Sequence, residues 1–297
     1  MLPSLARASV VATFAVAALV LAALVWAIVG RDWASTEQTA TPARPQRIVS
    51  VNPCLDALLV RIAPANRIAG ISAYSHDPRA TSLPMGMATR FPAIANTAEA
   101  IVAARPDLVL STGPLAPGTA RTLDQLGIAR REFGLPQTID ESLAQIDELA
   151  RATGAQTNGR TFRRRIEREL AQLAARPDAR RLPALIRQRS GLVPGPPSLP
   201  DQLMRHVGLI NAAAGYGIAN WQTLPLEPVL ANPPALLFTE IENGEATGFN
   251  ARVIDRLRST SRLSDFPERL LWCAGPSMVD AARALKAGRD AALKRPR

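Results

Sequence analysis

The chain has 297 residues, 47% of them hydrophobic, so it is long enough to bury one large core or two medium ones. Its formal net charge of +10 at pH 7 would ordinarily suggest a nucleic acid partner. Nearly all of that charge is arginine spread along the whole chain, however, and neither a zinc-finger spacing nor an RNA-binding aromatic motif accompanies it. We therefore expect no nucleic acid partner.

The N-terminal segment carries an uncharged apolar stretch at 8–30 that is rich in Ala, Val and Leu. This stretch is long enough to span a bilayer, and it predicts a signal peptide or an N-terminal membrane anchor over 1–30. The small-residue cleavage signal within it is weak, so both outcomes stay open. Residues 31–45 are polar, with Thr, Ala and Pro, and predict a flexible linker to the folded part.

One short motif occurs twice in the chain. Glu99 opens an apolar helix that precedes a strand at 108–110, and Glu227 opens an equivalent stretch before a strand at 236–238. In both copies an Ala follows the Glu by four residues and a Pro by seven. The copies are 227 − 99 = 128 residues apart, which indicates two related lobes. Each Glu is either a simple N-terminal helix charge or one of a pair of docking points, and the repeat favours the second interpretation.

The first lobe alternates strands with helices, which is the pattern of a parallel sheet wrapped by helices. The predicted elements are a strand at 47–51, a helix at 54–62, a strand at 67–72, the strand at 108–110 and a helix at 119–126. In such sheets the loops at the carboxyl ends of the strands form the binding crevice. That rule places Asn52, Tyr74, His76 and the turn around Gly113 on one rim.

A helical connector is predicted next, with an amphipathic helix at 140–152 and a heavily charged helix at about 159–175. The second helix has only a narrow apolar stripe and therefore packs on one side. The stripe consists of Phe162, Ile166, Leu170 and Leu173. This helix suits a rigid connection between the lobes, and a solvated surface helix is compatible with the same pattern.

The second lobe begins with a poor strand that Arg187 and Arg189 interrupt. These arginines either bind carboxylates or phosphate on a ligand, or they indicate a degraded strand, one that has lost the apolar pattern expected there. The predicted elements are this strand at 182–186, a turn-rich loop at 191–195, a helix at about 199–207, the strand at 236–238, a last strand near 270–273 and a closing helix to about 287.

Taken together, several segments resemble the periplasmic substrate-binding proteins of cobalamin, haem and ferric-siderophore ABC importers. These segments are Arg47 to Cys54, the Tyr74 to Pro78 loop, Ala98 to Val109, Leu126 to Ile128, and Leu226-Glu227. The resemblance covers roughly 47–288 and rests on the order and spacing of the segments.

The resemblance implies an α/β fold of two Rossmann-like lobes, each with a central parallel sheet, joined by a single long helix. The corresponding boundaries are an N-terminal lobe at 46–138, a helical connector at 139–180 and a C-terminal lobe at 181–297. It also implies that Glu99 and Glu227 pair with arginines of the permease. Exposed ion pairs of this kind add little affinity but fix register and specificity.

By the same resemblance, the chain is a solute-binding protein that delivers a corrinoid or a ferric chelate to an ABC permease and its ATPase. It would lie in the periplasm, either soluble or tethered to the inner membrane by 8–30. A haem receptor is the nearest alternative. A membrane-anchored sensor or scaffold that keeps the fold without transport is an alternative of another class.

A large, partly flat chelate would be held by aromatic rings and a few polar groups. Aromatic residues make up only 4% of the chain, so Tyr74, Trp221 and Trp272 are the candidate contacts, although each could equally be packing. Asn52, His76 and Gly113 complete the predicted ligand-binding set. A lone His in a loop is usually structural, but His76 could also cap a metal inside a bound chelate.

No resident cofactor, protein metal site or enzyme activity is predicted. The chain has 2 histidines, too few for a His-rich metal site, and no nucleophile and base at catalytic spacing stands out. Its 2 cysteines, Cys54 and Cys273, fall one in each predicted lobe near the cleft. An exported protein meets an oxidising compartment, so they are either bridged across the lobes or two free buried thiols.

Overall fold

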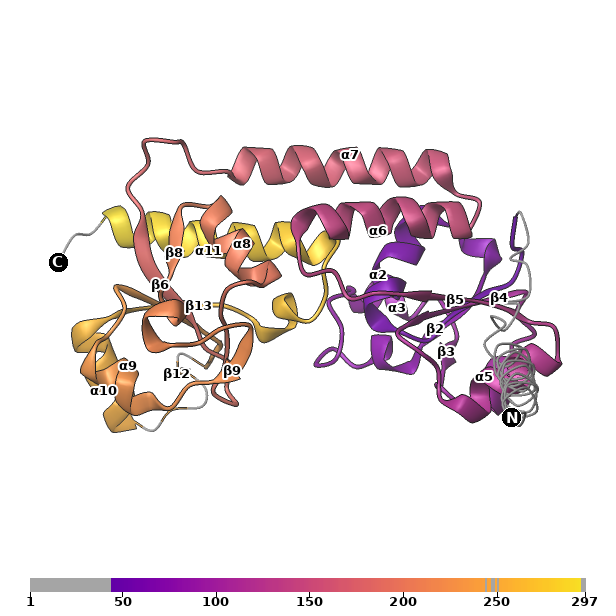
Figure 1. Cartoon of the computed structure of the whole chain (residues 1–297), viewed down its shortest axis with the longest axis horizontal. Coiled ribbons are helices and arrows are strands. Elements are labelled where there is room, and N and C mark those ends of the chain that lie inside the picture. Colours follow the sequence, from indigo (N-terminus) through magenta and orange to yellow (C-terminus); the bar gives the residue numbers. More distant parts are fainter. Residues whose placement is uncertain (1–43, 244, 247–248, 250, 295–297) are drawn as a thin grey trace, which may run out of the picture. The chain divides into compact units, whose positions relative to one another are not determined.

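The computed structural model describes residues 44–243, 245–246, 249 and 251–294, and residues from Thr41 onward form one compact unit (Figure 1). The predicted membrane segment at 8–30 and nearly all of the predicted linker at 31–45 lie outside the described residues. Within the described ranges, no helix is both long enough and apolar enough to cross a membrane.

The N-terminal lobe is built on a parallel five-stranded sheet in the order β3-β2-β1-β4-β5. Its strands are β1 (Ile48–Ser50), β2 (Ile68–Ser72), β3 (Ala93–Ile94), β4 (Leu108–Thr112) and β5 (Ala129–Phe133). In the central strand, Ile48 and Val49 are both fully buried. A parallel sheet is covered on both faces, which is why its central strands read as continuous apolar runs.

Helix α2 (Pro53–Ile62) shows how the local sequence sets an element of this lobe. The side-chain oxygen of Asn52 accepts hydrogen bonds from the amides of Cys54 and Leu55, and Pro53 occupies the first turn. Both are typical of a helix start. The other helices of the lobe are α3 (Met85–Ala88), α4 (Ala98–Ala103), α5 (Pro117–Gln125) and the 3-10 turns η1 (Ala65–Arg67) and η2 (Ala73–His76).

Two antiparallel helices, α6 (Ile139–Ala152) and α7 (Gln156–Leu173), form the connector, with α7 lying along α6 (Figure 1). Helix α7 packs against α2 of the first lobe and against α11 (Pro276–Lys294) of the second. Ile166 and Leu170 are buried, whereas Phe162 and Leu173 are partly buried against the same core. The predicted stripe and the single long connecting helix are therefore confirmed.

The C-terminal lobe contains a parallel sheet in the order β13-β10-β6-β8 and two small antiparallel pairs, β7-β9 and β11-β12. The strands are β6 (Leu182–Ile186), β7 (Leu192–Pro194), β8 (Leu209–Asn211), β9 (Trp221–Thr223), β10 (Leu236–Thr239), β11 (Ile241–Glu242), β12 (Glu245–Ala246) and β13 (Arg262–Asp265). The helices are α8 (Leu199–His206), α9 (Leu226–Ala231), α10 (Ala251–Thr260), α11, η3 (Ala212–Tyr216) and η4 (Glu268–Leu271). The two copies of the sequence repeat form α4-β4 and α9-β10.

Four expectations for this lobe were wrong. The apolar run at 270–273 is no strand: Leu270 and Leu271 end η4, and the last strand is β13. The loop expected at 191–195 contains β7, and the closing helix continues to Lys294. Strand β6 is not degraded, because it is an inner strand hydrogen-bonded between β10 and β8. The arginines that suggested degradation follow the strand and do not interrupt it.

Candidate functional site

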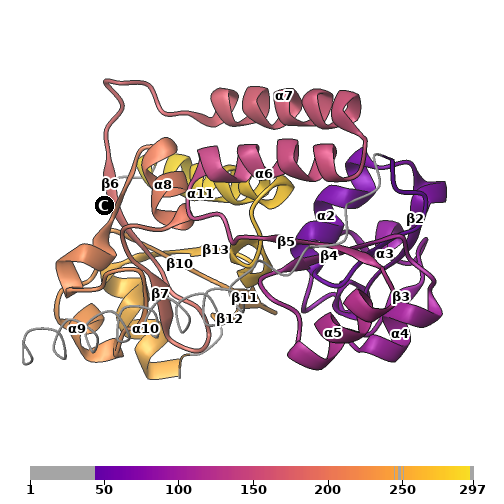
Figure 2. The same ribbon diagram turned by 45° about the vertical axis from the view of Figure 1, so that its right-hand side comes forward.

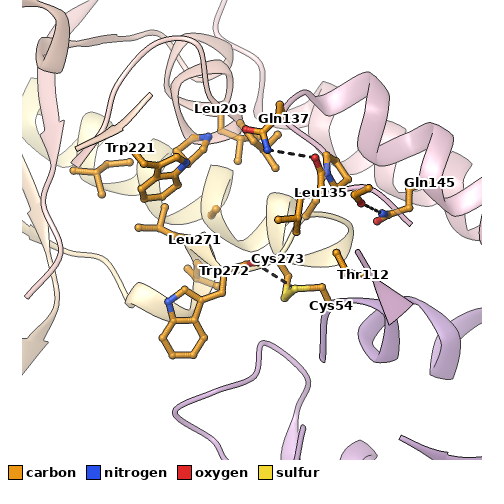
Figure 3. A pocket seen from close by; sticks show the side chains of 18 of the residues that line it. Cys54, Thr112, Leu135, Gln137, Gln145, Leu203, Trp221, Leu271, Trp272 and Cys273 are labelled. Carbon is orange, nitrogen blue, oxygen red and sulfur yellow. Dashed lines mark hydrogen bonds between the residues drawn. A yellow bond between two sulfur atoms is a disulfide. The ribbon is translucent and has the colours of Figure 1, made fainter. Parts of the chain in front are cut away.

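A cavity of about 210 Å³ lies between the two lobes (Figure 3). On the N-terminal side Cys54, Thr112 and Gly134 line it, directly beyond the carboxyl ends of β1, β4 and β5. Ile186 at the end of β6 lines it from the other lobe. The cavity thus occupies the place where parallel α/β sheets bind ligands, outside the carboxyl ends of their strands.

The wall of the cavity is mainly apolar. Leu203 of α8, Leu285 of α11 and Leu270 of η4 contribute to it. Two indoles, those of Trp221 and Trp272, also line the cavity, with Leu271 between them in Figure 3. Trp221 is half-buried, whereas Trp272 is 39% exposed. No charged side chain is among the described residues that line the cavity. Such a wall suits an uncharged, partly aromatic surface.

The two glutamine side chains of the wall donate to carbonyl groups of the loop after β5. The Nε2 of Gln145 donates to the carbonyl of Gly134 at 2.7 Å, and the Nε2 of Gln137 donates to that of Leu135 at 3.3 Å. Leu135 itself is 62% exposed at the edge of the cavity. These contacts hold the loop after β5 in place, so its backbone and Leu135 form a defined side of the cavity.

Cys54 and Cys273 are joined in a disulfide that lines the cavity, with Cα atoms 5.1 Å apart and a separation of 219 positions in sequence. The bridge links the start of α2 to the segment before α11, and hence one lobe to the other. Beside it, the amide of Gly275 donates to Ser142 Oγ at 2.8 Å. Of the two states that the sequence left open, the structure has the bridge, although Cys273 follows η4 and not a strand.

The structure brings only two of the predicted ligand residues into the cavity, Trp221 and Trp272. Asn52 is engaged as the cap of α2. Tyr74 is 64% exposed on η2, at the same edge of the N-terminal sheet but outside the cavity lining. His76 ends the same turn, and its buried Nε2 has no hydrogen-bond partner. Gly113 adjoins Thr112 with a φ of +68° and donates its amide to Phe133.

The two arginines after β6 do not line the cavity. The guanidinium of Arg189 is paired with Glu240 at 3.0 Å and with Glu242 at 2.9 Å. Arg187 is 7% exposed, its guanidinium lies 4.8 Å from the ring centroid of Phe249, and burial lowers its pKa. Neither side chain is therefore placed to bind an acidic group of a ligand in this cavity.

The loop after β5, which supplies Gly134, Leu135 and Gln137, was not among the predicted site residues. It was missed because β5 itself was not predicted, since Arg130, Arg131 and Glu132 hide its strand character. This strand lies at the edge of the sheet, where charged side chains are tolerated. The turn-forming residues that follow Phe133 were the available signal.

No group of three or more His, Cys, Asp or Glu side chains that could hold a metal ion occurs among the described residues. Of the two histidines, His206 is part of the connector contact, with its Nε2 2.8 Å from the carbonyl oxygen of Leu170.

Solved structures with the same fold include the periplasmic haem-binding protein HutB of Vibrio cholerae, with a TM-score of 0.68 and 17% identity over 84% of this chain and 99% of that one. The periplasmic vitamin B12-binding protein BtuF of Vibrio cholerae has a TM-score of 0.65 and 20% identity over 86% and 100%. The periplasmic haem-binding protein RhuT of Roseiflexus sp. RS-1, in its apo form, has a TM-score of 0.61 and 23% identity over 83% and 99%. At these identities the likeness shows the fold alone.

No curated protein matches the chain by sequence. A family model described as periplasmic binding protein does match, over residues 48–267. That match spans most of both lobes, from β1 to the end of the last strand of the second sheet. The chain belongs to the periplasmic binding protein family.

Proposed function

We propose that the chain is the solute-binding component of an ABC importer and that its cargo is a corrinoid or a ferric chelate. Family membership implies a periplasmic protein of the solute-binding type. The observation that carries the proposal is the apolar cavity between the lobes, with Trp221 and Trp272 in its wall and no charged side chain in its described lining. This chemistry favours a large, flat and largely neutral ligand.

The size of the cavity indicates how such a ligand would bind. Its volume of about 210 Å³ is below the ~300–1,000 Å³ that is usual for ligand pockets, so only part of a corrinoid would enter it. The remainder would lie against exposed apolar groups at the rim. Tyr74, Leu135 and Trp272 are exposed by 64%, 62% and 39%, which is high for large apolar side chains and is consistent with ligand contact.

A haem receptor is the second candidate. Haem iron is normally held by an axial His, Tyr, Met or Cys thiolate, and no such ligand is among the described residues of the lining, where both cysteines are in a disulfide. The lining therefore favours a metal that brings its own ligands. Haem would have to be ligated from outside the cavity, by Tyr74 or His76 at the edge of the first lobe.

The permease would dock through Glu99 and Glu227. Both side chains are exposed in the first turn of a short helix, one in each lobe. Figure 2 shows the two helices, α4 and α9, in different lobes and both on the side away from α7. One carboxylate on each lobe would set the register of the docked complex through arginines of the permease.

The membrane segment at 8–30 would tether the protein to the inner membrane if it is not cleaved. Two features would favour a membrane-anchored sensor or scaffold without transport, an uncleaved N-terminus and a weakened strand at 182–186. The strand at 182–186 is not weakened, because β6 is an inner strand with partners on both sides. We therefore favour the transport function.

The proposal is tested by titrating the full chain, purified in mild detergent, with cyanocobalamin, cobinamide, haem and a panel of ferric siderophores while tryptophan fluorescence is followed. We expect saturable quenching by one corrinoid or ferric chelate at micromolar concentration or below. Saturation by haem alone would select the second candidate. A folded protein that responds to none of these probes would contradict both.

A matched pair of variants links binding to the cavity. Trp272→Ala removes an exposed aromatic side chain from the wall and should weaken binding about tenfold, as expected for one aromatic contact of roughly 1.5 kcal/mol. Ile210→Ala truncates an apolar side chain that is similarly exposed, at 47%, but does not line the cavity. It should leave the affinity unchanged, and equal losses in both variants would place the ligand elsewhere.

A further inference from the structure

A buried carboxyl group lies next to the carboxyl end of strand β2 in the first lobe. Asp56 is in the first turn of α2, two residues after Cys54, and it is fully buried. It does not line the cavity. Its side chain forms no ion pair within 4 Å among the described residues, and its Oδ1 has no hydrogen-bond partner. A buried carboxyl without a cation is costly when ionised.

The partners of Asp56 belong to one short segment, the end of β2 and the turn η2. Its Oδ2 accepts a hydrogen bond from the amide of Ser72 at 2.9 Å and from the hydroxyl of Ser75 at 2.6 Å. These two residues flank Tyr74, whose own amide donates to Ser72 Oγ at 3.2 Å. One carboxyl group therefore binds the turn through Ser72 and Ser75, which precede and follow Tyr74 in sequence.

The surroundings of this carboxyl group are neutral. The groups that act on it are Ser50 of β1, Ser72 of β2 and Ser75 of η2. His76 is the titratable residue next to them in the chain, and it forms neither a hydrogen bond nor an ion pair with Asp56. Burial raises the pKa of Asp56 to about 7, and the nearby hydroxyls of Ser50 and Ser75 and the amide of Ser72 oppose that rise.

We propose that Asp56 is a positioning residue for the turn at 73–76, which its neutral form holds against the lobe and its ionised form releases. The inference rests on the proposed function only in taking Tyr74 as part of the ligand-binding edge. Asp56 would then determine whether the ring of Tyr74 is presented in one fixed place or on a mobile segment.

The direction of the pH effect follows from the thermodynamic linkage between proton binding and opening of the turn. Lifting the turn away from the lobe admits water to Asp56, and the pKa of the hydrated carboxyl returns towards its ordinary value of 3.8. The closed turn therefore binds a proton that the open turn gives up. Raising the pH from about 4 to about 7 therefore favours the open turn, by up to about tenfold in the opening equilibrium for each pH unit, and the effect levels off above about 7, where the carboxyl is ionised in both forms.

The test is amide hydrogen exchange on the full chain in detergent between about pH 4 and 9, corrected for the intrinsic pH dependence of exchange and followed in peptides covering 70–78. This measurement needs no ligand, so its result is independent of whether the proposed cargo is right. We expect corrected exchange of this segment in the wild type to rise by up to about tenfold per pH unit between about pH 4 and 7 and to level off above about 7. It should stay low and flat in Asp56→Asn, which keeps the accepting oxygen and cannot ionise.

Three further variants identify the titrating group. Ser75→Ala removes a hydrogen bond that stabilises the charged carboxylate. It should therefore move the midpoint of the transition, the pH near which exchange levels off, to a higher value. His76→Gln should keep the midpoint of the wild type. Asp201→Asn changes another buried carboxyl in the first turn of a helix, in α8 of the other lobe, and should also keep it.

A corrected exchange rate that does not change with pH in the wild type would overturn the proposal even if Asp56→Asn did not fold. A rise that persists in Asp56→Asn, or one that disappears in His76→Gln, would overturn it as well. With cyanocobalamin as the probe, the affinity of the wild type should fall as the pH rises from about 4 to 7 and that of Asp56→Asn should not. A complete lack of cobalamin binding would count against the proposed cargo and leave the exchange result to decide on Asp56.

Discussion

Gly275 is a point of close approach between the second lobe and helix α2. Its φ of +67° lies in the left-handed region, and a Cβ built on it would be 2.6 Å from Cδ2 of Leu58. Gly275→Ala combines backbone strain with a core clash, so we expect it to lower the free energy of unfolding by about 1–3 kcal/mol. Denaturant unfolding would measure the loss.

A control for this substitution is Gly118→Ala in α5, where an added Cβ meets nothing within 4 Å. Its stability should be unchanged or slightly higher, because Ala is the better helix former. If both substitutions had the same effect, the contact between Gly275 and Leu58 would not matter for stability.

The burial of Asp56 should also make the stability of the whole fold depend on pH. Its pKa of about 7 in the native protein is above the ordinary 3.8, so the native state holds a proton that the unfolded chain has released in this window. Its contribution to stability is therefore fully present below about pH 4 and is lost as the pH rises through about 7. The melting temperature should fall more steeply from pH 5 to 8 in the wild type than in Asp56→Asn. Parallel profiles would contradict the assignment.

At the level of elements, the connector depends on a close contact between its two helices. Gly159 of α7 faces α6 so closely that a Cβ would lie 2.4 Å from that of Ala150. Gly159→Val would force the helices apart and should cost about 1–3 kcal/mol in chemical denaturation. Thr161→Val, on an exposed position of the same helix, is the control and should cost less than about 0.5 kcal/mol. Similar losses in both would mean that β-branching and not the helix contact is responsible.

The elements that the sequence predicted correctly are those with a strong apolar period. The buried face of α2 and the stripe of α7 follow directly from residue spacing, because a helix that packs on one side needs apolar residues every three or four positions. Strands β5 and β13 were missed because both are edge strands with charged residues. The apolar run before Cys273 was misassigned because burial in a cavity wall and burial in a sheet leave the same composition.

At the scale of the whole molecule, the disulfide closes a loop of 219 residues and holds the two lobes together at the cavity. In the chain-entropy model a loop of this length is worth about 5 kcal/mol. Cys54→Ser with Cys273→Ser should therefore lower the melting temperature by several degrees, and reduction of the wild type should give the same value. An unchanged melting temperature in the double variant would show that the packing between the lobes suffices without the bridge.

The proposed docking to the permease would also be a property of the whole molecule, because it would use one glutamate from each lobe. Glu99→Arg together with Glu227→Arg should abolish uptake of the cargo in cells while its affinity in solution stays the same, since neither residue lines the cavity. Charge reversal of two exposed acids outside α4 and α9, Asp140→Arg with Asp178→Arg, is the matched control and should leave uptake intact. Uptake that survives the change at Glu99 and Glu227 would refute their docking role.

The sequence by itself determined the two lobes, their parallel sheets and the long connecting helix. Period, repeat and turn residues are local properties that can be read along one chain. Only the tertiary structure decided which residues form the cavity, because it joins segments such as 134–137 and 270–274 that are far apart in sequence. The same holds for the pairing of Cys54 with Cys273, and for the burial that makes Asp56 a titrating group. Distance and desolvation depend on how the lobes pack, and no local pattern encodes them.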